Sequence, residues 1–132
     1  MTKISMVAAV VATIGLSACA ASGPTPQEIA AADYGPPPPA EYQQIIKDRF
    51  AQTLIDPTSP LYTFDEPRRS YVLEAPMYGR PRMFGWRVCG TVNAKNRMGG
   101  YTGKDQFLAL FRNGALVHLN TGADMVGEAC RR

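Results

Sequence analysis

The distribution of hydrophobic and polar positions divides the chain into an apolar start, a polar middle and a patterned remainder. Residues 4–18 form an uncharged run that ends before Cys19, and residues 20–40 hold few large apolar side chains. Residues 41–55 carry apolar side chains every three or four positions, which predicts one amphipathic helix. Asp56-Pro57 predicts its end, because a residue before proline avoids helical backbone angles. The apolar stripe of this helix comprises Tyr42, Ile45, Ile46, Phe50, Leu54 and Ile55.

Further along the chain the helical period gives way to the alternation that is typical of strands. Residues 69–75 and 83–93 are predicted strands, and the second of them alternates clearly. Residues 106–112 and 115–120 flank Asn113-Gly114, a pair that favours the positive φ angles of a two-residue hairpin turn. The sequence therefore predicts an α+β fold, with one N-terminal helix packed on an antiparallel sheet of about four strands. One face of the 83–93 strand carries Phe84, Trp86, Val88, Gly90 and Val92, and the other carries Gly85, Arg87, Cys89, Thr91 and Asn93.

The two-residue turn also predicts the register of the hairpin and the role of each of its faces. The expected pairs are Arg112 with Ala115, Leu110 with Val117, and Leu108 with Leu119. We expect the leucine and valine pairs to face the helix, which leaves a second apolar face that needs a cover. We expect the C-terminal tail, residues 121–132, to supply it with Met125 and Val126. The covered face would hold Phe107, Ala109, Phe111, Leu116 and His118.

Length and charge narrow the classes of protein that fit this pattern. The chain has 132 residues, which suits a single domain. Its 14 Lys and Arg against 11 Asp and Glu give a formal net charge of +3. This excess is too small to indicate the concentrated basic face of a nucleic-acid-binding protein, so no nucleic-acid partner is expected.

The first nineteen residues have the layout of a signal peptide. A basic start, Met1-Thr2-Lys3, precedes an apolar run that spans about 22 Å as a helix, short of a bilayer core of about 30 Å. The run ends in Leu16-Ser17-Ala18-Cys19, which resembles the lipobox of bacterial lipoproteins. The resemblance implies cleavage before Cys19 and acylation of that residue, so the lipid bilayer is an expected partner. The alternatives are an ordinary secretory signal and a membrane helix. Ala20 stands where an Asp would resemble an inner-membrane retention signal, which favours the outer membrane of the cell envelope.

The segment after this cysteine is rich in proline, including an unbroken run at residues 36–39. Consecutive prolines favour an extended polyproline II backbone, and the segment has too few apolar residues to pack. We expect a spacer; the alternative is a proline-rich ligand for a partner's aromatic groove, with Tyr34 beside the prolines. The predicted organisation is a signal peptide at 1–18, a lipidated cysteine and linker at 19–40, and one domain at 41–132.

The cysteines add a long-range constraint. With Cys19 lipidated, Cys89 and Cys130 remain as an even pair in an oxidising compartment. Cys89 lies on the predicted strand face opposite Trp86, where a tail crossing that face would reach it. We therefore predict a Cys89–Cys130 disulfide that ties the tail to the sheet. Two free thiols are the alternative.

The most distinctive stretch is residues 88–103, which read VCGTVNAKNRMGGYTG. Their pattern CGxVNxKNxxGGYxG resembles a motif of small, uncharacterised bacterial envelope proteins. In that group a helix ending in an Asp-Pro-x-Ser turn precedes the motif, and Asp56-Pro57-Thr58-Ser59 matches this turn. The resemblance covers roughly residues 41–112 and implies a fold but no activity.

The same stretch is the main candidate for a binding site. Gly99 and Gly100 permit unusual backbone angles, and Asn side chains can hydrogen-bond local backbone, so one interpretation is a purely structural turn. The other is a polar loop that binds a glycan or an anionic group of the envelope. Its binding side chains would be Asn93, Lys95, Asn96, Arg97 and Tyr101.

Catalytic and metal-binding motifs give little support to an enzyme. His118 is the one histidine, and no recognisable nucleophile motif accompanies it. Spacings typical of zinc, calcium or phosphate sites are absent, so no cofactor is expected. We expect a non-catalytic binding or structural module, whose partner is an envelope protein or peptidoglycan. The alternative is a periplasmic inhibitor or small enzyme that acts on envelope components, with His118 as the first residue to test.

Overall fold

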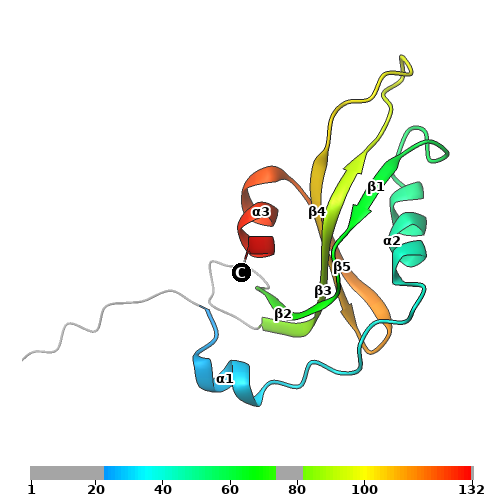
Figure 1. Ribbon diagram of the computed structural model, residues 1–132. Coiled ribbons are helices and arrows are strands. Elements are labelled where there is room, and N and C mark those ends of the chain that lie inside the picture. Colours follow the sequence, from blue (N-terminus) through cyan, green and yellow to red (C-terminus); the bar gives the residue numbers. More distant parts are fainter. Residues whose placement is uncertain (1–22, 74–81, 132) are drawn as a thin grey trace, which may run out of the picture.

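Five strands form one antiparallel sheet, with α2 against one face and α3 against the other (Figure 1). The structure, a computed structural model, describes residues 23–73 and 82–131. Strand β3 is the longest strand; β2 pairs with its first half and β1 with its second half, so both share one edge. Strands β4 and β5 continue the sheet on the other side of β3. The elements are α1 (Pro26–Ala31), α2 (Tyr42–Ala51), β1 (Leu61–Phe64), β2 (Arg68–Leu73), β3 (Arg82–Asn93), β4 (Asp105–Arg112), β5 (Ala115–Thr121) and α3 (Ala123–Arg131).

This arrangement confirms the predicted α+β fold and adds a strand that the pattern missed. Strand β1 has only four residues, of which Tyr62 and Phe64 pack toward the core. Four residues between Pro60 and Asp65 are too few for alternation to stand out from a turn. The expected strand at residues 69–75 corresponds to β2, and its last two residues lie outside the described part of the chain. None of the described helices has the length and apolar character to cross a bilayer.

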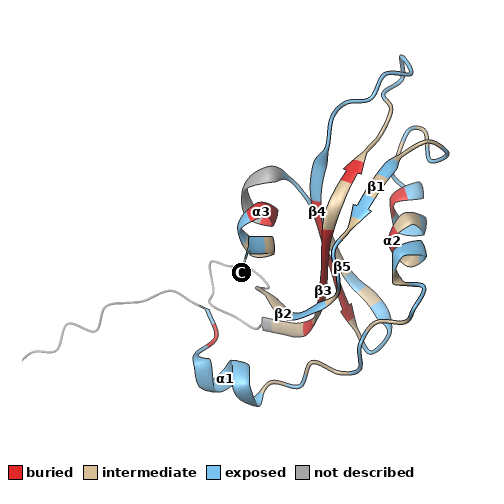
Figure 2. Cartoon of the chain, in the orientation of Figure 1, coloured by how far each residue is buried: buried red, intermediate tan, exposed pale blue. Residues whose placement is uncertain are grey.

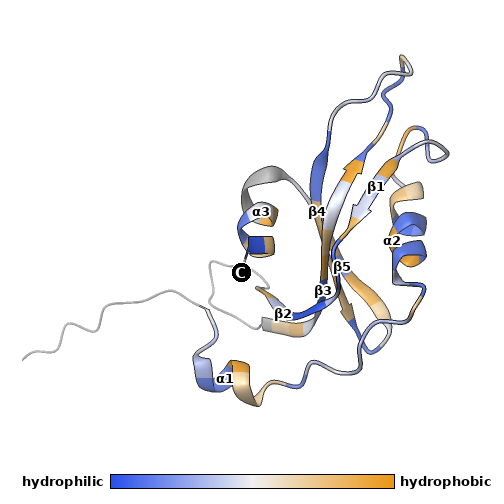
Figure 3. Ribbon diagram, in the orientation of Figure 1, coloured by the Kyte–Doolittle hydropathy of each residue, from blue (hydrophilic) through white to orange (hydrophobic). Residues whose placement is uncertain are grey.

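Helix α2 begins close to the predicted position but ends earlier than the apolar stripe suggested. Ile46 at the middle of the helix and Phe50 near its end are buried, and the helix is hydrophobic toward the sheet and hydrophilic outside (Figures 2 and 3). The Thr53 amide and hydroxyl both donate to the Phe50 carbonyl, which closes the helix with a tighter turn. Ile55, expected in the stripe, is therefore carried into solvent and is 64% exposed. The core on this side joins Ile46, Phe50, Val88, Val92, Phe107, Ala109 and Phe111.

The β4–β5 hairpin confirms the predicted turn but not the register beyond it. Asn113 and Gly114 both have positive φ, 51° and 80°, as the two-residue turn requires. Arg112 pairs with Ala115 as expected. A bulge then inserts Val117, so that Leu110 lies opposite His118 and Leu108 opposite Asn120. Val117 is 42% exposed as a result.

The predicted roles of the two hairpin faces are reversed on β4, whereas on β5 Leu119 packs on the α2 side as expected. Phe107, Ala109, Phe111 and Leu116 pack on the α2 side of the sheet, whereas Leu108 faces α3. The neighbouring strand explains this choice, because Gly90 of β3 pairs with Phe107. A Cβ atom on Gly90 would lie 2.7 Å from Phe107 Cζ, so the missing side chain leaves room for the ring. This places Phe107 on the same face as Gly90, Val88 and Val92, where α2 lies.

The C-terminal tail forms a helix that covers the face away from α2; on the hairpin this is the face of Leu108 and not the expected face of Phe107. Val126 and Cys130 of α3 pack against Cys89 and Leu108. The predicted disulfide is present between Cys89 and Cys130, whose Cα atoms lie 6.0 Å apart across a sequence separation of 41. A covalent bond therefore fastens the last helix to the central strand.

The proline-rich segment packs more than its composition suggested. Its described part, residues 23–40, contains α1, which Thr25 and Glu28 cap reciprocally. Beyond α1, the Gly35 carbonyl accepts from Trp86 Nε1 at 3.0 Å, and Arg112 Nη1 donates to the Asp33 carbonyl at 2.7 Å. The expectation of an unpacked spacer overlooked these backbone acceptors, which need no apolar side chains of their own. Cys19, the signal peptide and the start of the linker lie outside the described residues.

Candidate functional site

The predicted binding loop, residues 94–103, continues from β3 and holds its own shape. Asn96 Oδ1 accepts from the amides of Met98 and Gly100, at 2.9 and 3.1 Å. Asn93 Oδ1 accepts from the Gly103 amide at 3.1 Å. These two predicted ligand-binding side chains thus bind the backbone of their own loop. The structural interpretation of the turn accounts for both asparagines.

The other three predicted residues remain accessible to a ligand. Lys95 and Tyr101 pair across the loop as an isolated antiparallel β-bridge. The Lys95 ammonium lies 5.3 Å from the centre of the Tyr101 ring. Arg97 is exposed and has no ion pair or hydrogen bond among the described residues. Met98 at the tip is 94% exposed. The loop therefore offers two cations, one aromatic ring and one apolar side chain.

The two sequence motifs that the resemblance singled out meet in space. The Tyr101 hydroxyl donates to the Ser59 carbonyl at 3.0 Å, and Leu61 pairs with Asn93 just beyond it. We call this surface the loop end: the turn 56–59, Leu61 and the loop 94–103. Three large apolar or aromatic side chains are exposed on it, namely Leu61 (57%), Met98 (94%) and Tyr101 (45%).

The turn at the loop end is organised by one carboxylate. Asp56 accepts from the Ser59 hydroxyl at 2.6 Å and from the hydroxyl and amide of Thr58 at 2.6 and 3.0 Å. The Ser59 bond first, then the Thr58 bonds and the positive charge of Lys95, lower the pKa of Asp56 from 3.8 to about 2. The carboxylate thus stabilises the turn that supports Tyr101. A shallow hollow of about 280 Å³ adjoins this turn and is lined by Gln44, Lys47, Asp48, Ala51, Pro57, Thr58, Pro60 and Tyr62.

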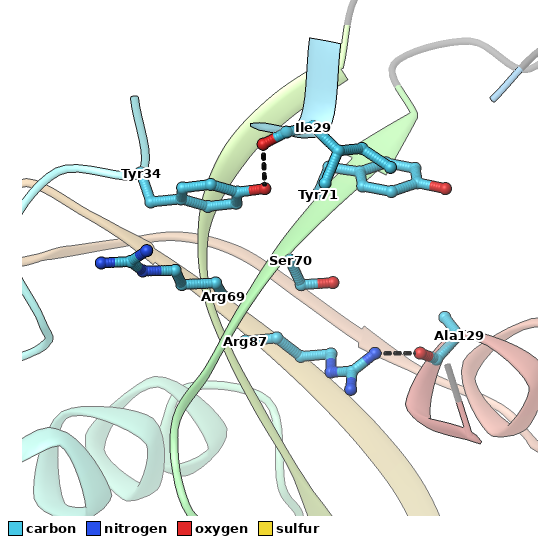
Figure 4. Close-up of a pocket in the computed structure, with 7 residues that line it drawn as sticks. All are labelled: Ile29, Tyr34, Arg69, Ser70, Tyr71, Arg87 and Ala129. Atoms are coloured by element: carbon cyan, nitrogen blue, oxygen red, sulfur yellow. Dashed lines mark hydrogen bonds between the residues drawn. The ribbon is translucent and has the colours of Figure 1, made fainter. Parts of the chain in front are cut away.

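A second hollow, of about 140 Å³, opens at the β2 edge of the sheet (Figure 4). The Arg69 guanidinium lies 5.5 Å from the ring centres of both Tyr34 and Trp86. The Arg87 side chain comes from the other face of the sheet and donates to the Ala129 carbonyl. The hollow is lined by Ile29, Tyr34, Arg69, Ser70, Tyr71, Arg87 and Ala129.

Two arginines, Arg69 and Arg87, contribute to the lining of this hollow. Arg87 is only 6% exposed, and its contact near the C-terminal end of α3 places it where helix carbonyls favour a positive charge. Arg68 is its cross-strand partner, so two like charges face each other on β2 and β3. Arg69 has ring contacts but no hydrogen bond or ion pair within the described chain. An anion at this edge would be attracted by the exposed Arg68 and Arg69 side chains.

Sequence reasoning missed this hollow because its residues come from five separate segments. No spacing connects Tyr34, Arg69, Arg87 and Ala129 along the chain. The alternation of β3 did place Arg87 beside Cys89 on the tail side, which the structure confirms. That was the only available signal, and it carried no information on α1 or on the packed linker.

His118 and the two domain cysteines, the residues considered for catalysis, lie in separate contacts. His118 lies on β5 with its Nε2 atom 2.8 Å from Asn120 Nδ2, and no hydroxyl or thiol there bonds to the imidazole. Cys89 and Cys130 are joined to each other. Within residues 23–73 and 82–131, no three His, Cys, Asp or Glu side chains gather into a metal-binding group.

Comparison with known proteins finds no matching family model, no matching curated protein and no matching solved structure.

Proposed function

We propose that this chain is a lipid-anchored protein of the bacterial cell envelope, and that its domain is a non-catalytic binding module. The lipobox resemblance of Leu16-Ser17-Ala18-Cys19 supports the anchor, and a short apolar run before it supports a cleaved signal. The Cys89–Cys130 disulfide supports folding in an oxidising compartment outside the cytoplasm. Ala20 after the lipobox favours the outer membrane.

The proposal depends on one observation: the start of the described chain and the loop end lie at opposite ends of the domain. The described chain begins at Gly23 beside Tyr71, at the end where β2 and α1 lie, whereas the loop end lies at the other end of β3 (Figure 1). From Gly85 to Asn93, β3 rises about 26 Å before the loop begins. An anchor at Cys19 therefore leaves the loop end directed away from its attachment point.

The loop end suits a partner with negatively charged and apolar or sugar-like groups. Lys95 and Arg97 can bind carboxylates or phosphates, and Tyr101 offers a ring face for a sugar or an apolar group. Peptidoglycan presents both glycan and carboxylate groups, so we propose it as the ligand; an envelope protein with an acidic surface would use the same side chains.

Co-sedimentation tests this binding. The protein is extracted from bacterial membranes in detergent and mixed with purified peptidoglycan at low and at high salt. We expect pelleting at low salt that decreases as salt screens the charges. The double variant Lys95→Gln/Arg97→Gln should remain in the supernatant. The control Arg49→Gln/Arg131→Gln removes two exposed charges elsewhere and should pellet like the parent.

Two results would contradict the proposed binding. One is a parent protein that stays in the supernatant at low salt. The other is an equal loss of pelleting in both double variants, which would indicate general charge attraction without a site. Intact mass of the extracted protein tests the anchor separately, since lipidation predicts a chain that begins at Cys19 with added acyl mass.

A further inference from the structure

The covalent distance between the proposed anchor and the folded domain is short. Only residues 20–22 separate Cys19 from Gly23, the first described residue. Four steps between consecutive Cα atoms span at most about 14 Å, even in a fully extended chain. If acyl chains hold Cys19 at the bilayer surface, Gly23 must lie within that distance of it.

Residues 23–35 are packed on the sheet. The part of the sheet that they contact must therefore also lie near the bilayer. Pro24 is buried, and a Cβ atom on Gly23 would lie 3.6 Å from the Tyr71 hydroxyl. At the other end, the Tyr34 ring contacts the Phe84 ring edge-on at 5.6 Å. The bonds from Trp86 to the Gly35 carbonyl and from Arg112 to the Asp33 carbonyl complete the attachment. We call residues 33–35 with these contacts the latch.

The latch depends on the close fit of a glycine. Gly35 has φ of +67°, and a Cβ atom there would lie 2.6 Å from Asn113 Oδ1 of the hairpin turn. An alanine would be strained by its backbone angle and would also displace the Asn113 side chain. Gly99 has a similar φ of +80° but no atom within 4 Å of its Cβ position. Gly99→Ala is therefore a matched control for the backbone strain alone.

The surface next to Gly23 has the side chains expected at a headgroup layer. We call it the anchor edge: α1 with Arg68, Arg69, Ser70 and Tyr71 of β2. Ile29 is 39% exposed there, and the first half of β2 is strongly hydrophilic (Figure 3). Arg68 and Arg69 have no carboxylate partner within the described residues. Arginine and tyrosine place an apolar stem or ring beneath a polar group, which suits the boundary between lipid and water.

We infer that the anchor edge is the surface that lies on the bilayer, and that Arg68 and Arg69 there contact the phosphates of lipid headgroups. The inference rests on the proposed lipidation of Cys19. It adds an orientation: the domain lies against the membrane by a defined edge and does not move freely on a long tether. The hollow of Figure 4 then opens toward the headgroups.

Contact quenching in vesicles tests the orientation with the full lipidated protein. Its native cysteines are blocked by lipid and by the disulfide, so a fluorophore can be attached to a single new cysteine, Ser70→Cys or Met98→Cys. Vesicles contain anionic phosphatidylglycerol and a lipid with a nitroxide on its headgroup. We expect severalfold stronger quenching at position 70 than at position 98. Equal quenching at both positions would overturn the inference.

Two further variants test the latch and the charges. Gly35→Ala should lower the quenching at position 70 to the level at position 98, because the tether lengthens, while Gly99→Ala should leave it unchanged. Arg68→Gln should reduce the difference between anionic and neutral vesicles, whereas Arg49→Gln on α2 should not. No effect of Gly35→Ala, or the same effect from Gly99→Ala, would contradict the latch. No effect of Arg68→Gln would contradict the headgroup contact.

Flotation of the vesicles separates this inference from the proposed function. If the protein carries no acyl mass and does not float with vesicles, the lipid anchor itself is wrong. If it floats but the two positions are quenched equally, the anchor stands and the orientation is wrong.

Discussion

The substitution Gly90→Ala tests the packing that sets the orientation of the whole hairpin. Gly90 lies on β3 between two neighbours, β1 and β4. A Cβ atom there would overlap the carbonyl oxygen of Thr63 and would lie 2.7 and 2.9 Å from two atoms of the Phe107 ring. The carbonyl belongs to strand backbone and the ring is fully buried, so neither can move without disturbing its own packing.

The expected cost is at the upper end of the range for overpacked cores, about 3 kcal/mol. With a urea m value near 1.5 kcal/mol/M, this cost shifts the unfolding midpoint down by about 2 M. Trp86, the one tryptophan of the chain, lies four residues away on β3 and reports the transition by fluorescence. The measurement uses the detergent-solubilised protein with its disulfide intact.

Gly100→Ala is the matched control, because the nearest atom to its Cβ position is 3.8 Å away and its φ is ordinary. Its midpoint should change by the equivalent of less than about 0.5 kcal/mol. If Gly90→Ala also falls within that range, the Phe107 ring does not cover Gly90. The assignment of hairpin faces would then lose its physical reason.

Three other perturbations have defined outcomes. Cys89→Ala/Cys130→Ala should cost about 4 kcal/mol in the chain-entropy estimate for a loop of this length; reductant should shift the parent's urea midpoint similarly and leave the variant unchanged. Asp56 has a folded pKa of about 2, below its ordinary 3.8, so its contribution to stability is present above pH 3.8 and is lost as pH falls toward 2. Carbon NMR should find that low titration midpoint for the Asp56 carboxylate, and Ser59→Ala should raise it. An unchanged midpoint in Ser59→Ala would refute the Ser59 hydrogen bond as the main cause of the low pKa. Arg112→Met removes donors to two carbonyls, and amide exchange of residues 33–35 should rise about tenfold for a loss near 1.4 kcal/mol.

The parts of the fold that the sequence predicted are those with a strong one-dimensional pattern. Alternation in β3 correctly separated Val88 and Val92 from Arg87 and Cys89, because only one of these sets is consistently apolar. The Cys89–Cys130 bond could be predicted because two cysteines remain besides Cys19 and because Cys89 lies on the strand face that the tail covers. The α2 stripe was clear for the same reason, since Ile46 and Phe50 recur at one helical spacing.

The predicted orientation of the β4–β5 hairpin was wrong because both of its faces are apolar. Leu108 and Leu110 are as hydrophobic as Phe107 and Phe111, so alternation defines two faces without saying which one meets a helix. The bulge at Val117 then shifts the register by one residue, and no residue near it marks a bulge in the sequence. The deciding contact, Gly90 with Phe107, joins two strands and was not visible along either one.

The two candidate surfaces differ in how far the sequence could reveal them. The loop end has local marks, since Gly99-Gly100 and the flanking asparagines define a turn within a few residues. Its contact with Ser59 depends on β1, which was missed. The anchor edge depends on the docking of α1 and the latch, which is driven by backbone carbonyls. Backbone acceptors are present at every position, so they leave no pattern for sequence reasoning to use.

Four consecutive residues of β3, Trp86 to Cys89, contact the latch, α2 and α3. Trp86 holds the latch, Arg87 contacts the end of α3, Val88 packs under α2, and Cys89 forms the disulfide. Because side chains alternate along a strand, these contacts fall on opposite faces and reinforce one rigid element. The same strand continues into the loop end. A force or ligand at the loop end and a bilayer at the anchor edge would therefore act on one continuous backbone segment. Loosening the latch should alter where the domain stands on the membrane without altering what the loop end binds.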